Sequence, residues 1–315
     1  MKVLHITNAF PCASHPALGI FVEEQIASLE EIGVQTDVVF INAIEYGKKE
    51  YLRYIFKIRE LSKNYDLIHC HHTYCGIIFM LSKVNKPWMI SLLGDITKER
   101  YIDRLFFKII KRNAERIILK NTKILADERF VYLPNGVNLD FFSPEKKNIA
   151  REKLCLDANQ KFVLFVSAGQ ISRKEKRHDK FIAVLNELQQ KGHVLQPLYL
   201  EKVKRDQVPL YYNACDLLLL TSDHEGSPNA VKEALACNKP VVSTDVGNVK
   251  TLLQGCPGCF VARENSVAEL TQLVLKAMNV TYSGGRERLI EQQLDHISVA
   301  KKLKGLYKEI LKERN

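Results

Sequence analysis

The most constraining feature of the sequence is an apolar run that leads directly into a turn and a helix-like segment. Residues Asp216 to Thr221 consist of four consecutive leucines between two polar residues, which is typical of a strand buried on both faces of a parallel sheet. Gly226 permits a turn after this strand, while Ser227 and Pro228 suit the cap and the first position of a helix. We therefore predict a strand, a tight turn and a helix, in that order.

This order would place a helix N-terminus at the carboxyl edge of a sheet. Its unpaired N–H groups and positive dipole end favour an anion, with phosphate as the first candidate. Two carboxylates, Glu225 and Glu233, flank the predicted turn and helix start. Because carboxylates repel phosphate, we interpret them as acceptors for the hydroxyl groups of a sugar. The alternative is that Glu225 only complements the helix dipole and Glu233 lies on a solvated surface.

The same alternation of strand-like and helix-like segments continues along the chain, and it predicts an α/β fold with parallel sheets. The predicted strands are Met1 to Asn8, Gln35 to Ile41, Asp66 to His71, Trp88 to Leu92, Lys161 to Val166, Asp216 to Thr221 and Val241 to Thr244. A turn cluster at Leu133 to Asn138, followed by Phe141 to Pro144, predicts a domain boundary. We expect one domain over 1–142, a second over 143–295, and a C-terminal helix over 296–315 that packs back on the first.

Length and charge restrict the class of protein. A chain of 315 residues is long enough for two domains. Its net charge of +10 favours an anionic partner, which by charge alone is a phosphate-bearing ligand, a membrane surface or nucleic acid. No apolar stretch reaches the length of a membrane-spanning helix, and Met1 to Asn8 is too short for a signal peptide. We expect a cytoplasmic protein.

The eight cysteines are scattered, as expected for reduced thiols in a cytosolic protein. Cys256 and Cys259 have the spacing of a redox or metal motif. No second Cys or His pair completes a zinc site, so we interpret the Pro-Gly between them as a turn.

Several further residues lie where parallel sheets bind ligands. Gly19 falls between the first strand and the first helix, where backbone often approaches phosphate. His69, His71 and His72 close another strand, and they either ligate a metal or only form hydrogen bonds. Asp95 follows a further strand, and it either faces the cleft or forms a turn beside a glycine.

Two basic segments suggest anionic partners. In the loop Gly169 to Arg177, Arg173 and Lys176 lie three residues apart and could bind a diphosphate together, unless the loop is simply solvated. The stretch Glu99 to Lys123 predicts a basic helix interleaved with apolar residues. Such a helix either lies on an anionic membrane or presents a solvated face above a core-facing stripe. Lys48 to Lys63 is a second basic helical stretch.

Taken together, these motifs resemble the retaining family-4 glycosyltransferases. The motifs are Glu225-x7-Glu233 with Pro240 to Gly247, Arg173-x-x-Lys176, Leu133 to Val137, and Gly19-Ile20-Phe21. The resemblance covers nearly the whole chain and is strongest from Phe162 to Val261. Members of that family have the GT-B architecture, in which two facing Rossmann-like domains hold the active site between them.

The resemblance also implies residue roles. Arg173 and Lys176 would neutralise the diphosphate leaving group, and Gly19 would offer its backbone N–H to the donor phosphate. Glu225 would hold hydroxyls of the transferred sugar, and Glu233 the hydroxyls of the ribose. The segment beside Glu225 that would bind the donor comprises Gly226, Ser227, Pro228 and Asn229. His71 or His72, together with Asp95, would lie near the sugar and acceptor.

The implied function is transfer of a sugar from a nucleotide-diphospho-sugar to a saccharide or lipid-linked acceptor, with retention of configuration. We expect a role in synthesis of cell-surface polysaccharide (lipopolysaccharide or exopolysaccharide) or glycolipid, at the inner face of the cell membrane, and no nucleic-acid partner. We expect neither cofactor nor metal ion, because Asp-x-Asp is absent and Asp223-His224-Glu225 is a poor substitute. The alternatives are a sugar-nucleotide 2-epimerase of the same architecture and a non-catalytic partner subunit.

Overall fold

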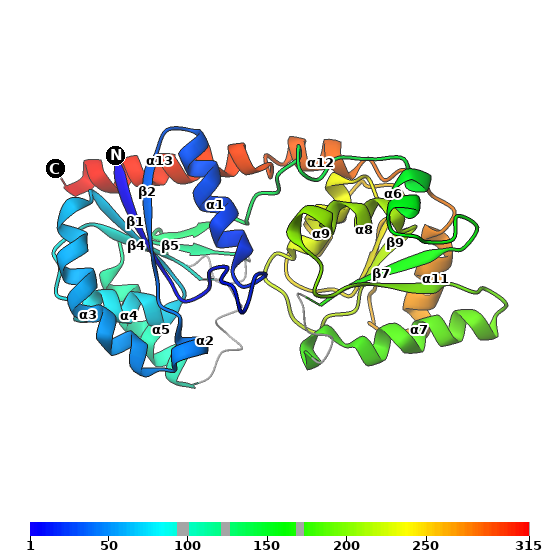
Figure 1. The fold of residues 1–315 in the computed structure, drawn as a ribbon, viewed down its shortest axis with the longest axis horizontal. Coiled ribbons are helices and arrows are strands. Elements are labelled where there is room, and N and C mark those ends of the chain that lie inside the picture. Colours follow the sequence, from blue (N-terminus) through cyan, green and yellow to red (C-terminus); the bar gives the residue numbers. More distant parts are fainter. Residues whose placement is uncertain (93–100, 121–126, 168–172, 315) are drawn as a thin grey trace. The chain divides into compact units, whose positions relative to one another are not determined.

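The computed structural model describes residues 1–92, 101–120, 127–167 and 173–314, with only the backbone of Ile102 (Figure 1). The chain forms two compact units. Unit 1 comprises Met1–Gly136 and His296–Asn315, and unit 2 comprises Val137–Asp295. The first division falls before the sequence-based boundary at 142/143, because Val137, Leu139 and Phe142 are buried in a core of unit 2.

Within the described residues, unit 1 is built on a parallel sheet with the strand order β2-β1-β3-β4-β5-β6. The strands are β1 (Lys2–Thr7), β2 (Gln35–Phe40), β3 (Leu67–His71), β4 (Trp88–Ser91), β5 (Arg116–Leu119) and β6 (Phe130–Tyr132). The helices are α1 (Ile20–Glu31), α2 (Ala43–Tyr46), α3 (Lys49–Leu61), α4 (Thr73–Leu81), α5 (Tyr101–Asn113) and α13 (His296–Arg314). The chain moves outward from β1 to β2 and then returns past β1 to β3, so the direction of winding reverses between β1 and β3.

Helices cover both faces of this sheet, with α3, α4 and α5 on one face and α1 and α13 on the other (Figure 1). Successive strand residues point to opposite faces. Accordingly, Leu4 and Ile68 pack in the core beside α3–α5, while Val3 and Leu67 pack against α13. The C-terminal helix therefore completes the core of the unit that begins at the N-terminus.

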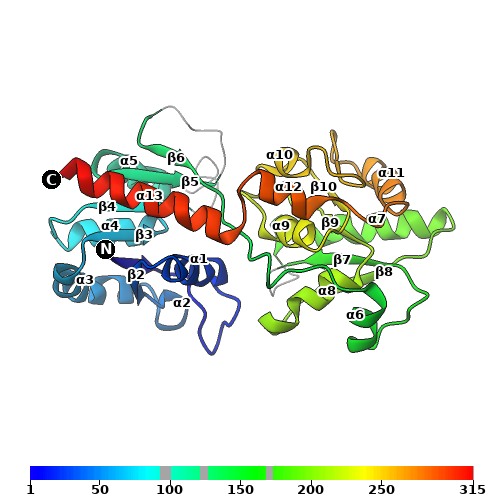
Figure 2. The same ribbon diagram turned by 90° about the horizontal axis from the view of Figure 1, so that it is seen from above.

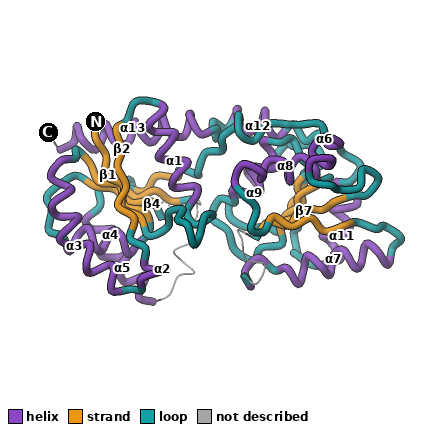
Figure 3. Tube along the Cα trace, in the orientation of Figure 1, coloured by secondary structure: helices purple, strands orange, loops and turns teal. Residues whose placement is uncertain are grey.

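Unit 2 contains a second parallel sheet, whose described strands have the order β11-β10-β9-β7-β8 (Figure 2). The strands are β7 (Phe162–Val166), β8 (Gln196–Leu200), β9 (Leu217–Leu220), β10 (Val241–Ser243) and β11 (Phe260–Val261). The helices are α6 (Lys147–Lys153), α7 (His178–Gln190), α8 (Val208–Ala214), α9 (Asn229–Ala236), α10 (Val249–Leu253), α11 (Val267–Ala277) and α12 (Gly285–Glu291). Here the winding reverses between β7 and β9. Figure 3 shows the strands of each unit enclosed by helices.

The predicted α/β class with parallel sheets is confirmed, but one predicted helix is wrong in extent. The stretch Glu99 to Lys123 divides into α5, which ends at Asn113, and strand β5. Ile117 and Ile118 are fully buried and pair with both β4 and β6. A short run of β-branched residues in the middle of a sheet thus overrides the helical periodicity around it.

A hydrogen-bonded group of histidines lies between the sheet of unit 1 and α13. His5 Nδ1 and His71 Nε2 are 3.0 Å apart, and His69 bonds to Ser91 through Nε2 (2.8 Å) and to Tyr307 through Nδ1 (2.7 Å). Among the described residues, these three histidines are also the one cluster of three or more His, Cys, Asp or Glu side chains that could hold a metal ion. Their potential ligand atoms all lie within 4.8 Å of one another.

We interpret this group as a polar network of the core. A metal ion would have to replace the hydrogen bonds of His69, and the neighbouring Lys120 ammonium would repel it. Burial lowers the pKa of His5 to about 3, and burial together with neighbouring cationic groups lowers the pKa of His69 and His71. Burial also lowers the pKa of Lys120 to about 7.

In the described part of the chain, no helix has both the length and the apolar character needed to cross a membrane.

The histidine network predicts that unit 1 is sensitive to acid. Because the folded pKa of His5 lies below its ordinary value of 6.5, the unfolded chain takes up a proton between about pH 6.5 and pH 3 that the folded chain does not. Stability should therefore fall as pH falls through this window, by up to about 1.4 kcal/mol per pH unit for each such histidine.

Trp88, the single tryptophan, is buried in β4 and reports unfolding of unit 1 by its fluorescence. We expect its denaturant midpoint to fall steadily from pH 7 to pH 5. Replacing the exposed His193 by Gln should leave this slope unchanged. A flat profile for the unsubstituted chain would contradict the interpretation.

Candidate active site

The candidate site of unit 2 lies where the winding of its sheet reverses. In open α/β sheets, ligands bind beyond the carboxyl ends of the strands at such a point. The loop after β7 carries Lys176, at the end of a short 3-10 helix over Lys174–Lys176, and the loop after β9 carries Glu225. Lys176 Nζ lies 2.6 Å from Glu225 Oε1, and both side chains are largely buried, at 12% and 16% exposed. Two residues 49 positions apart thus form one ion pair.

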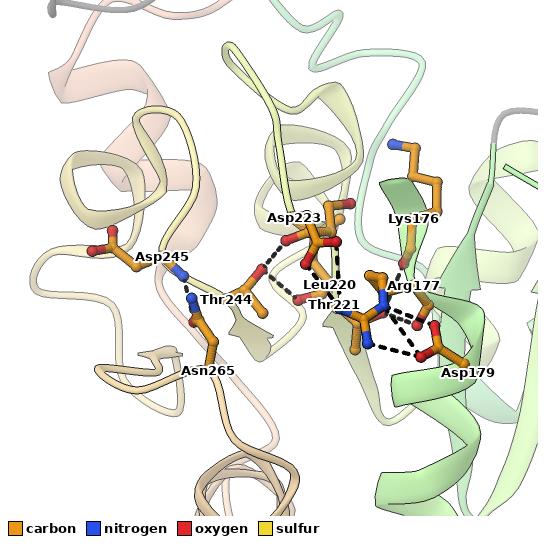
Figure 4. Close-up of polar contacts among 10 residues, drawn as sticks. Lys176, Arg177, Asp179, Leu220, Thr221, Asp223, Thr244, Asp245 and Asn265 are labelled. Carbon is orange, nitrogen blue, oxygen red and sulfur yellow. Dashed lines mark hydrogen bonds and ion pairs between the residues drawn. The ribbon is translucent and has the colours of Figure 1, made fainter. Parts of the chain in front are cut away.

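Two threonines tie these loops to the strand ends (Figure 4). The Thr221 hydroxyl lies 2.9 Å from the carbonyl oxygen of Lys176 and 3.0 Å from that of Arg177. The Thr244 hydroxyl donates to the carbonyl of Ser222 at 2.6 Å. Both hydroxyls are buried at strand ends, so they fix the backbone from which the charged side chains project.

Glu225 is also held by its own loop. The Ser222 hydroxyl donates to Glu225 Oε1 at 2.9 Å, the oxygen that Lys176 contacts. The backbone of the turn is braced from the next loop, where the N–H of Asn248 donates to the carbonyl of Gly226 at 3.2 Å. Gly247 has φ +55°, and a Cβ at this position would lie 2.2 Å from the carbonyl oxygen of Gly226. The turn therefore requires glycine at position 247.

The start of α9 differs from the sequence-based prediction. Pro228 is the N-cap residue, in an extended conformation with φ −66° and ψ 118°, and the helix begins at Asn229. Ser227 does not cap the helix, because Pro228 keeps the chain extended for one more residue. Among the described residues, Ser227 Oγ and Asn229 Oδ1 have no hydrogen-bond partner although both atoms are buried. Polar atoms left in this state are suited to a ligand.

Glu233, on α9, is only 9% exposed and has two partners from the preceding segment. The Tyr212 hydroxyl donates to Glu233 Oε2 at 2.6 Å. Arg205 Nη1 donates to Glu233 Oε1 at 3.2 Å. The alternative interpretation of Glu233 as a solvated surface residue is therefore wrong.

The remaining residues of the basic loop differ in their surroundings. Arg173 contacts Glu175, with Nη2 2.6 Å from Oε1, and Lys174 is exposed. Arg177 has a left-handed backbone (φ 52°) and pairs with Asp179 at 2.8 Å and Asp223 at 3.2 Å. The structure thus assigns Lys176 to Glu225 and leaves Arg173 with a partner of its own loop.

In unit 1, Gly19 is the N-cap of α1 in a left-handed conformation, with φ 64° and ψ 22°. A Cβ here would lie 2.1 Å from the carbonyl oxygen of Ala9, so the chain passes too close for any other residue. No described side chain caps this helix. Gly19 follows β1, beside the reversal point of its own sheet.

The histidines after β3 have different environments. His71 is fully buried in the histidine network, so a contact with sugar or acceptor would first require it to be uncovered, and that role stays a prediction. His72 is partly exposed, has φ 83°, and caps α4 by accepting from the N–H of Tyr74 at 3.4 Å. Non-glycine residues rarely adopt this conformation, and residues that do tend to cluster at functional sites. Asp95 lies outside the described residues.

The comparisons with known proteins agree with this geometry. Residues 163–279 match the family model described as Glycosyl transferases group 1. The chain is 25% identical to the putative teichuronic acid biosynthesis glycosyltransferase TuaC of Bacillus subtilis strain 168, over 80% of this chain and 83% of TuaC. It is 21% identical to the alpha-galactosylglucosyldiacylglycerol synthase of Streptococcus pneumoniae R6, over 87% and 80% of the two chains.

Solved structures show the same fold at low sequence identity. Sucrose-phosphate synthase of Thermosynechococcus elongatus matches with a TM-score of 0.80 and 15% identity, covering 99% of this chain and 100% of that one. Anabaena HepE in complex with UDP-glucose matches with a TM-score of 0.72 and 17% identity, covering 98% and 100%. The fold and the sequence matches together define a glycosyltransferase of the GT-B type.

Over residues 163–279 the chain matches the glycosyl transferases group 1, and it is related to glycosyltransferases of teichuronic acid and glycolipid synthesis. The predicted resemblance to this group of glycosyltransferases and the predicted GT-B fold are thereby confirmed, whereas the retaining character stays a prediction.

The residues that hold the charged groups in place were not among those predicted from the sequence. Tyr212 and Arg205 contact Glu233, Ser222 contacts Glu225, and Thr221 holds the backbone of Lys176. Thr221 could have been predicted, because it lies directly after a buried strand. The contacts of Arg205 and Tyr212 had no signal in the sequence, because they depend on how α8 and the 3-10 turn before it (Arg205–Gln207) pack beside α9.

The close approach at Gly247 gives a stability prediction. Gly247→Ala should destabilise unit 2 both by its left-handed backbone, at about 1–2 kcal/mol, and by the clash with the Gly226 carbonyl. Gly192→Ala is the matched control, because Gly192 also has positive φ (+83°) but no heavy atom lies within 4 Å of the place that a Cβ would take. Denaturant unfolding should show the larger loss for Gly247→Ala. Equal losses would mean that the turn tolerates a Cβ.

Proposed function

We propose that this chain transfers a sugar from a nucleotide-diphospho-sugar to a saccharide or lipid-linked acceptor, with retention of anomeric configuration. The product would belong to a cell-surface polysaccharide or a glycolipid. The relatives named for teichuronic acid and diacylglycerol glycoside synthesis, and HepE with its UDP-glucose, support this donor and these acceptor classes.

The observation that carries the proposal is the Lys176–Glu225 ion pair beside the start of α9. In this proposal Lys176 stabilises the negative charge that develops on the leaving diphosphate, and the first N–H groups of α9 assist it. Glu225 holds hydroxyls of the transferred sugar, and Glu233 those of the ribose. Arg173 would have to exchange Glu175 for the diphosphate, which its partly exposed position permits.

For unit 1, we propose that the N–H of Gly19 binds a donor phosphate, as the resemblance implies. Of the two histidines considered from the sequence, His72 is the better candidate for a substrate contact, because His71 is fully buried. The proposal assigns the leaving-group charge to side chains and backbone N–H groups, and it requires neither a metal ion nor a cofactor.

The first test compares two lysines of the same loop. A panel of nucleotide sugars identifies the donor, and turnover is then measured with and without candidate acceptors in excess EDTA. Lys176→Ala should lower kcat/KM by about two to three orders of magnitude, since it removes a charge from the developing diphosphate. Lys174→Ala, which alters an exposed side chain, should change it little. Equal small effects would reject the diphosphate assignment, and turnover without an acceptor would favour the epimerase.

We also propose that unit 1 contacts an anionic membrane through α3 and α5. On α5, Tyr101, Leu105 and Ile109 form an exposed stripe four residues apart, and Arg104, Lys108 and Arg112 form a basic stripe beside it. On α3, Leu52 and Phe56 lie beside Lys49, Arg53 and Lys57 in the same way. Phe56 and Tyr101 are 74% and 77% exposed. Both helices cover the same face of the sheet (Figure 1).

The structure changes which residues of α5 belong to this surface. Ile110 is fully buried, Phe106 contacts Tyr74 and Phe107 contacts Phe130, so these three side chains pack inward. Lys111 pairs with Asp127 at 3.5 Å. The exposed stripes are therefore the part that combines apolar and basic groups, a combination that suits anionic headgroups above acyl chains.

This surface predicts salt-dependent binding to vesicles. Replacing Arg104, Lys108 and Arg112 together by Gln should weaken sedimentation with vesicles that contain anionic lipid, since each basic residue near the surface contributes about 1 kcal/mol. Binding should also weaken as salt rises. Replacing Lys301, Lys302 and Lys308, from α13, is the control with the same loss of charge. Equal binding to neutral and anionic vesicles would reject the membrane contact.

A further inference from the structure

Glu233 is fixed from two sides by residues that neither the motifs nor the family resemblance singled out. Its carboxylate accepts from Tyr212 on Oε2 and from Arg205 on Oε1, at 2.6 and 3.2 Å. Tyr212 lies on α8 and Glu233 on α9, two helices of unit 2 that contact each other. The orientation of the carboxylate is thus set by the packing of these two helices.

The Tyr212 side chain is held in a fixed position by the surrounding core. Its side chain is fully buried, and its ring packs edge-on against Phe142 with 5.8 Å between the ring centres. Burial, and then the neighbouring Glu233 carboxylate, raise the pKa of the Tyr212 phenol well above its ordinary value. The phenol therefore stays protonated and donates its hydrogen to Glu233.

Arg205 supplies charge at the outer side of the carboxylate. Its guanidinium carbon lies 4.8 Å from the ring centre of Phe142 and 5.3 Å from that of Phe141, so the group is stacked as well as paired. The side chain is 26% exposed, whereas Tyr212 is wholly enclosed. Arg205 therefore holds the Glu233 carboxylate by charge as well as by a hydrogen bond.

We propose that Tyr212 and Arg205 are positioning residues that orient Glu233 for the two hydroxyl groups of a ribose. The inference rests on the proposed function, in which Glu233 binds the ribose of the donor. A carboxylate offers about four lone-pair positions. Among the described residues, Tyr212 and Arg205 occupy two of these, which leaves two positions that match a vicinal diol. Tyr212 thereby contributes to recognition of the nucleotide without touching it.

The test measures the preference for ribose rather than affinity alone. Binding of UDP, GDP and ADP is measured by calorimetry, and the tightest is compared with its 2′,3′-dideoxy form. Since a hydrogen bond to a charged group contributes about tenfold or more to affinity, we expect the ribonucleotide to bind at least tenfold more tightly than the dideoxy form. Tyr212→Phe should reduce this ratio to about threefold or less, while affinity for the dideoxy form stays unchanged. Arg205→Gln should also reduce the ratio.

The controls separate this inference from the proposed function. Tyr211→Phe makes the same chemical change at the neighbouring residue, which has no role in this arrangement, and it should keep the wild-type ratio. If Glu233→Gln lowers the ratio but Tyr212→Phe does not, the positioning role is overturned and the ribose contact stands. If no nucleotide binds, or if Glu233→Gln leaves the ratio unchanged, the proposed donor site itself is overturned.

Discussion

The candidate site depends on one topological constraint, which is that neighbouring parallel strands release their chains at the same edge of the sheet. β7 and β9 are adjacent, and the chain leaves them in opposite directions, toward β8 and toward β10. Their two loops must therefore meet beyond the strand ends. The Lys176–Glu225 ion pair bridges this junction, and the Thr221 hydroxyl holds the backbone beneath it. If either side chain lost its partner, the other charge would remain largely buried, and the cost of removing that charge from water would no longer be offset.

Much of the fold followed from the sequence because several of its strands, such as β7 and β9, are continuous apolar runs. A short run such as Leu217–Leu220 is typical of a strand in a sheet covered on both faces, and the confirmed strands lie within a residue or two of the predicted ones. The failure at β5 has the converse cause. Its four residues are too few to interrupt a helical pattern on either side, and only pairing with β4 and β6 decides their conformation.

The charged motifs were visible in the sequence, whereas their partners were not. The spacing of Glu225, Glu233 and Lys176 only suggested a ligand site, and the resemblance to a known family joined them as one set. Which atom each contacts depends on distances across the fold. Arg173 pairs with Glu175 of its own loop, and His71 is fully buried, and neither fact could be predicted from the position of the residue in the sequence. The sequence does not show which residues of a motif are buried and which are exposed, so their roles can be distinguished only from the structure.

The packing of α13 has a consequence for how the protein is made. Its buried residues, including Leu303 and Tyr307, complete a core formed with Val3 and Leu67 near the other end of the chain. The ribosome synthesises unit 2 before it synthesises this helix. During translation unit 2 can therefore fold first, while the first strands of unit 1 still expose the apolar face of the sheet that α13 later covers. Because these first strands stay exposed longest during synthesis, chaperones that bind nascent chains would have to protect them for the longest time.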